Sequence, residues 1–92
     1  MIEVDDGPLA SNAQLYGYLL QTAETLTRLG HSEAAMKVRD AAAHATGLST
    51  EFLGESRNAL VEALRSAVST MPSVDRNCLA AIINQLDRAL NR

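Results

Sequence analysis

The chain has 92 residues, which is enough for one domain with a single hydrophobic core. Its 47% hydrophobic and 21% charged residues lie near globular averages and argue against a disordered or collagen-like chain. The net charge is -3 and the basic residues are dispersed, so the sequence lacks the concentrated positive charge that binds nucleic acid.

The segment over residues 1–10 is expected to be a flexible lead-in, because it is acidic and contains the turn-prone sequence Asp5-Asp6-Gly7-Pro8. An acidic start also differs from the basic start of a secretory signal. The longest uninterrupted apolar run spans 78–83, far short of the roughly 20 residues that cross a bilayer. A single cysteine cannot form an internal disulfide. We therefore expect a cytoplasmic protein with no membrane partner.

The first helix is expected between Ser11 and Gly30. Ser11 and Gln14 have the spacing of a capping box, in which two side chains satisfy backbone groups at a helix start. The apolar residues that recur at helical spacing are Leu15, Leu19, Ala23, Leu26 and Leu29.

The second helix is expected after a Ser32 cap, and Gly47 should end it in the left-handed conformation. Its inner face is made of small residues: Ala34, Val38, Ala41 and Ala45. Such a face buries little apolar area, so this helix is the weakest wall of the predicted core.

The third helix should begin at a Ser49 cap, with Leu48 packed against Leu53 as a hydrophobic staple, and Pro72 should stop it. Its predicted apolar stripe consists of Leu53, Leu60, Leu64, Ala67, Val68 and Met71. The fourth helix should begin at a Ser73 cap. Its stripe consists of Leu79, Ile82, Ile83, Leu86 and Leu90.

The predicted fold is all-α: a small antiparallel up-down four-helix bundle over residues 11–92, reduced to three helices if the second one frays. Only 3% of the residues are aromatic, so aliphatic residues and alanine must fill the core, which favours helices over sheets. Short connections make successive helices antiparallel neighbours.

Residue types that carry out chemistry are present but not assembled into a known motif. His44 follows Asp40 by four residues and could pair with it, although a solvated strip of charges is the more ordinary interpretation. One cysteine and two histidines are too few for a zinc site, and Cys78 is expected to be a small buried side chain. No phosphate-binding glycine loop or nucleophile elbow occurs. We expect no catalytic residue, no cofactor and no metal.

Two groups of charged residues are candidates for a binding surface. Glu51, Glu55 and Glu62 form a stripe on the outer side of the third helix, which either faces water or docks a basic partner. Arg57 falls within the apolar stripe of the same helix. It either extends to solvent or to a carboxylate such as Asp75, or belongs to an interface, where arginine is enriched.

The first helix has more apolar surface than one neighbouring helix needs, because Tyr16, Tyr18 and Leu20 widen its stripe. The helix could occupy the centre of the bundle and touch two others. Alternatively these side chains meet another chain, since tyrosine is favoured at interfaces.

These features predict a non-catalytic protein-protein interaction module that self-associates, as a homodimer, through the residues named above. One form of this hypothesis is a small acidic immunity or antitoxin protein that blocks a basic partner. The alternative is a ligand-binding or enzymatic bundle with a pocket under the second helix, where Arg57 would bind an anionic group and Tyr16 could add a polar contact.

Overall fold

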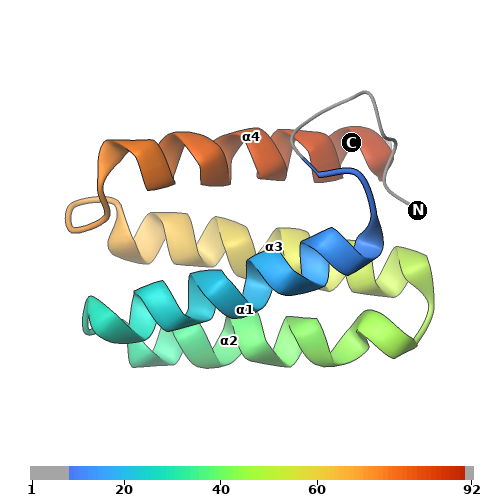
Figure 1. The fold of residues 1–92 in the computed structure, drawn as a ribbon, viewed down its shortest axis with the longest axis horizontal. Coiled ribbons are helices and arrows are strands. Elements are labelled where there is room, and N and C mark those ends of the chain that lie inside the picture. Colours follow the sequence, from blue (N-terminus) through green and yellow to red (C-terminus); the bar gives the residue numbers. More distant parts are fainter. Residues whose placement is uncertain (1–8, 91–92) are drawn as a thin grey trace.

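The computed structural model describes residues 9–90 and contains an all-α four-helix bundle, as predicted. Its elements are α1 (Asn12–Arg28), α2 (Ser32–Ala42), the 3-10 helix η1 (Ala43–Thr46), α3 (Ser49–Ala67) and α4 (Ser73–Ala89). Each α-helix runs antiparallel to the next one along the chain (Figure 1). None of the helices within 9–90 combines the length and apolar character that a membrane crossing requires.

The start of α1 has the predicted cap. The Ser11 hydroxyl accepts a hydrogen bond from the Gln14 backbone N–H at 3.2 Å. The Gln14 side chain reaches back one residue further than in a standard capping box and accepts the Ala10 N–H at 2.7 Å. Two otherwise free backbone groups are thereby satisfied.

The other three predicted caps are wrong, because each serine is already the first helical residue. The residue before it accepts the first helical hydrogen bond through its carbonyl oxygen, and none of these three preceding residues makes a side-chain cap bond. The serines are Ser32, Ser49 and Ser73, and the true cap positions are His31, Leu48 and Pro72.

The ends of α1 and α2 differ in the conformation of their glycines. Gly30 has a φ of +89°, and the His31 N–H donates to the Leu26 carbonyl, so α1 ends as glycine C-caps commonly do. The prediction of a left-handed Gly47 is wrong, because its φ is -97°. The chain there tightens into η1, and the Gly47 N–H bonds the His44 carbonyl at 3.0 Å instead.

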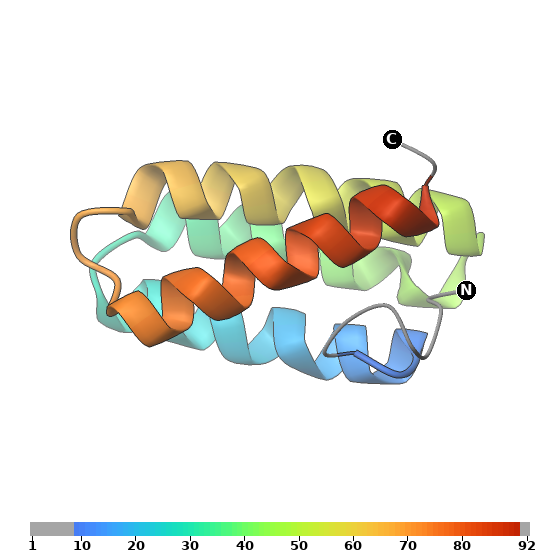
Figure 2. The ribbon, with the colours of Figure 1, turned by 90° about the horizontal axis from the view of Figure 1, so that it is seen from above.

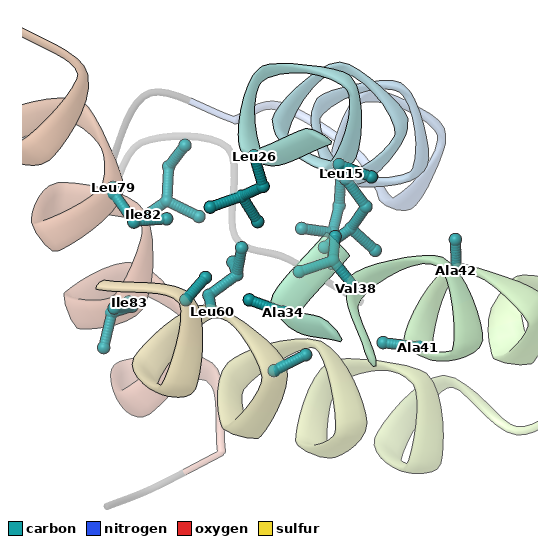
Figure 3. Packing of buried hydrophobic residues seen from close by; sticks show 14 of the residues in the cluster. Leu15, Leu26, Ala34, Val38, Ala41, Ala42, Leu60, Leu79, Ile82 and Ile83 are labelled. Carbon is teal, nitrogen blue, oxygen red and sulfur yellow. The ribbon is translucent and has the colours of Figure 1, made fainter. Parts of the chain in front are cut away.

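The core forms where the four helices converge (Figure 3). Leucine and isoleucine side chains from α1, α3 and α4 meet the short side chains of α2, and the residues labelled are Leu15, Leu26, Ala34, Val38, Ala41, Ala42, Leu60, Leu79, Ile82 and Ile83. Helix α2 is therefore the wall of small residues that its sequence predicts.

Helix α3 buries a wider face than its predicted stripe, because it packs against both α2 and α4. Phe52 and Ser56 are fully buried although the stripe omits them. Val68, which the predicted stripe includes, is 49% exposed at the end of α3. The predicted staple is also wrong: Leu48 is 72% exposed and turns away from the core.

The seam between α1 and α4 is wide, since no Cα atom of α1 lies within 8 Å of one in α4. Residues 9–11, which precede α1, lie near the end of α4 (Figures 1 and 2). Leu9 is buried there and hydrogen-bonded to Gln85. Leu9, which the predicted flexible lead-in includes, is therefore packed against the bundle, and residues 1–8 of that lead-in lie outside the described residues.

Candidate functional site: the groove between α1 and α2

A groove of about 620 Å³ runs between α1 on one side and the end of α2 with η1 on the other. Six of its lining residues are alanine, leucine or tyrosine, and the full lining is Asn12, Ala13, Tyr16, Leu20, Arg39, Ala42, Ala43, Ala45 and Thr46. An apolar groove that faces solvent is the usual form of a site for another macromolecule or an apolar ligand.

Tyr16 and Leu20 form the wall of this groove on α1. They are four residues apart and so lie on successive turns of one helix face. Tyr16 is 43% exposed and Leu20 42%, whereas Leu15 and Leu19 point into the core and are fully buried. The surplus apolar width predicted for the first helix is therefore real for these two residues.

The floor of the groove is made of methyl groups. Ala42, Ala43 and Ala45 lie where α2 tightens into η1, and no larger apolar side chain lines this side. Opposite them the side chains of Tyr16 and Leu20 stand out from α1. The groove is hollow because a wall of large side chains lies next to a wall of small ones.

Both ends of the groove are polar, while its centre carries no charged side chain. At one end the Arg39 guanidinium donates to the Thr27 hydroxyl at 3.4 Å. At the other end Asn12 donates from Nδ2 to the Ser49 hydroxyl at 3.0 Å. An apolar partner could therefore fill the centre and find hydrogen-bonding groups at both ends.

Tyr18 lies outside the groove, on the side of α1 that faces α4. It is partly buried, and with Thr22, Asp75 and Cys78 it lines a separate cavity of about 230 Å³. Burial raises the pKa of the Tyr18 phenol well above its ordinary value, a hydrogen bond with Thr22 opposes this, and Cys78 and Asp75 add to it. Cys78 is exposed, which corrects its predicted burial.

Arg57 lies far from its predicted partner. Its Nε donates to Asp87 Oδ1 at 2.8 Å, and its Nη1 donates to Asn58 Oδ1 at 3.3 Å. Asp75 is wrong as the partner because antiparallel packing places the first half of α3 beside the last turns of α4, whereas Asp75 is in the first turn of α4. Arg57 and Tyr16 do not share a pocket.

The carboxylates of α3 face outward, as predicted, but lie in different surroundings. Glu51 Oε1 lies 2.8 Å from His44 Nδ1, and Glu62 lies 3.7 Å from Arg65. Glu55 and Glu62 line a shallow groove of about 240 Å³ between α2 and α3. The pair of Asp40 and His44 that the sequence allows does not form, because His44 belongs to η1, where the α-helical spacing of four residues no longer applies, and its Nδ1 lies beside Glu51 instead.

Within residues 9–90 no three histidine, cysteine or carboxylate side chains gather as a metal-binding group would. The chain matches no known family model, no curated protein and no solved structure.

The groove unites only two of the seven candidate residues, Tyr16 and Leu20. Tyr18 packs at the α1–α4 seam, Arg57 at the α3–α4 seam, and the three glutamates lie along α3. The floor of the groove, formed by alanines within residues 42–46, is absent from the predicted site. Its sequence signal is the cluster of alanines at 41–43 and 45, which leaves room for a partner as well as for close helix packing.

Proposed function

We propose that this chain is a non-catalytic protein-protein interaction module that binds through the groove between α1 and α2. The observation that carries the proposal is the exposure of Tyr16 and Leu20 beside a hollow floored by alanines. Covering a leucine side chain contributes about 1.5–3 kcal/mol when burial is complete. Neither a cofactor nor a metal is needed for this role.

The groove suits the apolar face of a helix. Its length follows two turns of α1, its centre is uncharged, and its ends offer Arg39 and Asn12 for polar contacts that fix the position of the partner. We also propose a cytoplasmic location, because the exposed thiol of Cys78 is free and suits a reducing compartment.

The test is site-specific photo-crosslinking in cells that produce the protein. A photoreactive benzoylphenylalanine replaces Leu20 in one variant and Val74, which is 77% exposed and outside the groove, in the control. The proposal predicts a protein adduct from position 20 and none from position 74. Absence of an adduct at position 20, or equal yields from both positions, contradicts it.

A basic protein is a second candidate partner, on a different face. Asp40, Glu55 and Glu62 line the shallow groove between α2 and α3, with Lys37 as its only cation. This arrangement favours the immunity or antitoxin form of the hypothesis, in which opposite charges guide association. A basic protein captured by the wild-type chain should be released by salt and should not bind an Asp40→Asn, Glu55→Gln variant. Capture that salt leaves unchanged would exclude this partner.

The ligand-binding alternative has less support. Its anion contact, Arg57, already donates to the Asp87 carboxylate and lines none of the grooves described above. An anion would have to displace Asp87 before it could bind.

A further inference from the structure

We propose that the occupant of the groove is a second copy of this chain, related to the first by a two-fold axis. This inference rests on the proposed function and names the partner. A two-fold interface brings the same surface patch of both copies together, so the patch must complement itself. The groove meets this condition because it presents a protruding wall, Tyr16 and Leu20, next to a hollow of alanines.

The position of the axis follows from the arrangement of α1 and α2. An axis between Tyr16 and Leu20 sets the two α1 helices antiparallel and exchanges the levels of these two residues. Each Leu20 then enters the hollow of the other copy beside Ala42 and Ala43, and each Tyr16 covers the adjacent turn of α2, toward Arg39. Small residues at such a contact let the helices approach closely while the larger side chains interdigitate.

The charges at the groove also suit a second copy. Arg39 lies at one end of the groove, and the two-fold axis sends the two Arg39 side chains to opposite ends of the interface. Like charges are therefore kept apart. Each guanidinium donates to the Thr27 hydroxyl of its own chain, so the centre of the interface carries no charge.

No other apolar surface among residues 9–90 offers this combination. The remaining large apolar side chains that are exposed are Met36, Leu48, Val68 and Val74. They come from four different segments, and none of them lines the groove. Since the patch spans only about two helical turns, the interface is small. We therefore expect a weak dimer that dissociates when the protein is diluted.

The test is sedimentation equilibrium over a wide range of concentrations, on the wild type and three variants. Leu20→Glu places a charge in the interface, Ala43→Leu fills the hollow, and Val74→Glu adds the same charge outside the groove. The dimer should weaken at least about 10-fold in Leu20→Glu and Ala43→Leu and stay unchanged in Val74→Glu. Circular dichroism verifies that each variant retains its helices.

A wild-type chain that stays monomeric at every concentration overturns the second copy as partner, and so does a dimer that Leu20→Glu and Val74→Glu weaken equally. These results are distinguishable from failure of the proposed function. A monomer that still gives an adduct from position 20 to a different protein keeps the binding module and rejects only the second copy. A chain that neither dimerises nor crosslinks at position 20 rejects both.

Discussion

Gln85 binds both polar groups of the Leu9 backbone. Its Oε1 accepts the Leu9 N–H at 3.1 Å, and its Nε2 donates to the Leu9 carbonyl at 2.7 Å. Both residues are buried, and they are 76 positions apart in the sequence. The Gln85 amide thereby satisfies the hydrogen-bonding groups of a non-helical residue at the wide seam between α1 and α4. The two hydrogen bonds connect Leu9 to the last helix.

Replacing Gln85 by leucine should destabilise the fold by about 1–3 kcal/mol, because the Leu9 N–H and carbonyl would both remain buried without a partner. Denaturant unfolding followed by circular dichroism measures this loss. The control is Asn84→Ala, an exposed neighbour on α4, which should change the free energy of unfolding by less than about 0.5 kcal/mol. Equal effects of the two substitutions would show that the hydrogen bonds to Leu9 add nothing to stability.

Removing the ion pair of Arg57 and Asp87 should lower the stability of the fold without weakening the dimer. Their side chains are 30% and 26% exposed, so a double-mutant cycle of Arg57→Ala and Asp87→Ala should give a coupling of about 0.5–1 kcal/mol in unfolding free energy. Dimerisation of both variants should match the wild type, since neither residue lines the groove. An Arg57→Ala variant that is fully stable but monomeric would place Arg57 in the interface instead.

Tyr18 predicts a loss of stability at alkaline pH. Because burial raises its pKa in the folded state, the folded chain holds the phenol proton more tightly than the unfolded chain does. This contribution is complete below about pH 10, the ordinary tyrosine value, and decreases as the pH rises above it. Unfolding free energies measured at increasing pH should therefore fall more steeply for the wild type than for Tyr18→Phe. Identical slopes would contradict the burial of this phenol.

Two glycine substitutions should change stability in opposite directions. Gly30→Ala should destabilise the fold by about 1 kcal/mol or more, since a Cβ atom is strained at a φ of +89°. Gly54→Ala should stabilise it by about 0.5–1 kcal/mol, because Gly54 is inside α3 and an added Cβ meets no atom within 4 Å. Thermal unfolding of both variants tests the pair. A destabilised Gly54→Ala variant would mean that its Cβ meets an atom after all.

Much of the fold could be predicted because helix periods and breakers are local. The apolar spacing up to Gly30 and the stop at Pro72 locate helices without knowledge of their neighbours. Features that depend on neighbours were harder to predict. Phe52 and Ser56 are buried because α3 lies between two other helices, and one stripe of sequence spacing does not show that second contact.

In the candidate site, too, local features could be predicted from the sequence, whereas features that depend on neighbouring helices could not. Tyr16 and Leu20 are recognisable because they are large apolar residues outside the main stripe of their own helix. The alanines across the groove are not, since their position opposite Tyr16 depends on how α2 lies against α1 and on its change into η1. The partner of Arg57 was mistaken for a similar reason: Asp75 and Asp87 lie at opposite ends of α4, and only the packed bundle shows which end meets Arg57.

The most direct test of binding through the groove is an isotope-filtered nuclear Overhauser experiment on a mixture of labelled and unlabelled chains. It detects only protons that lie close together in different molecules. The proposed dimer predicts intermolecular signals between the methyl groups of Leu20 and those of Ala42 and Ala43. Absence of intermolecular signals at concentrations where the chain is dimeric, or signals confined to the outer face of α3 or α4, would contradict it.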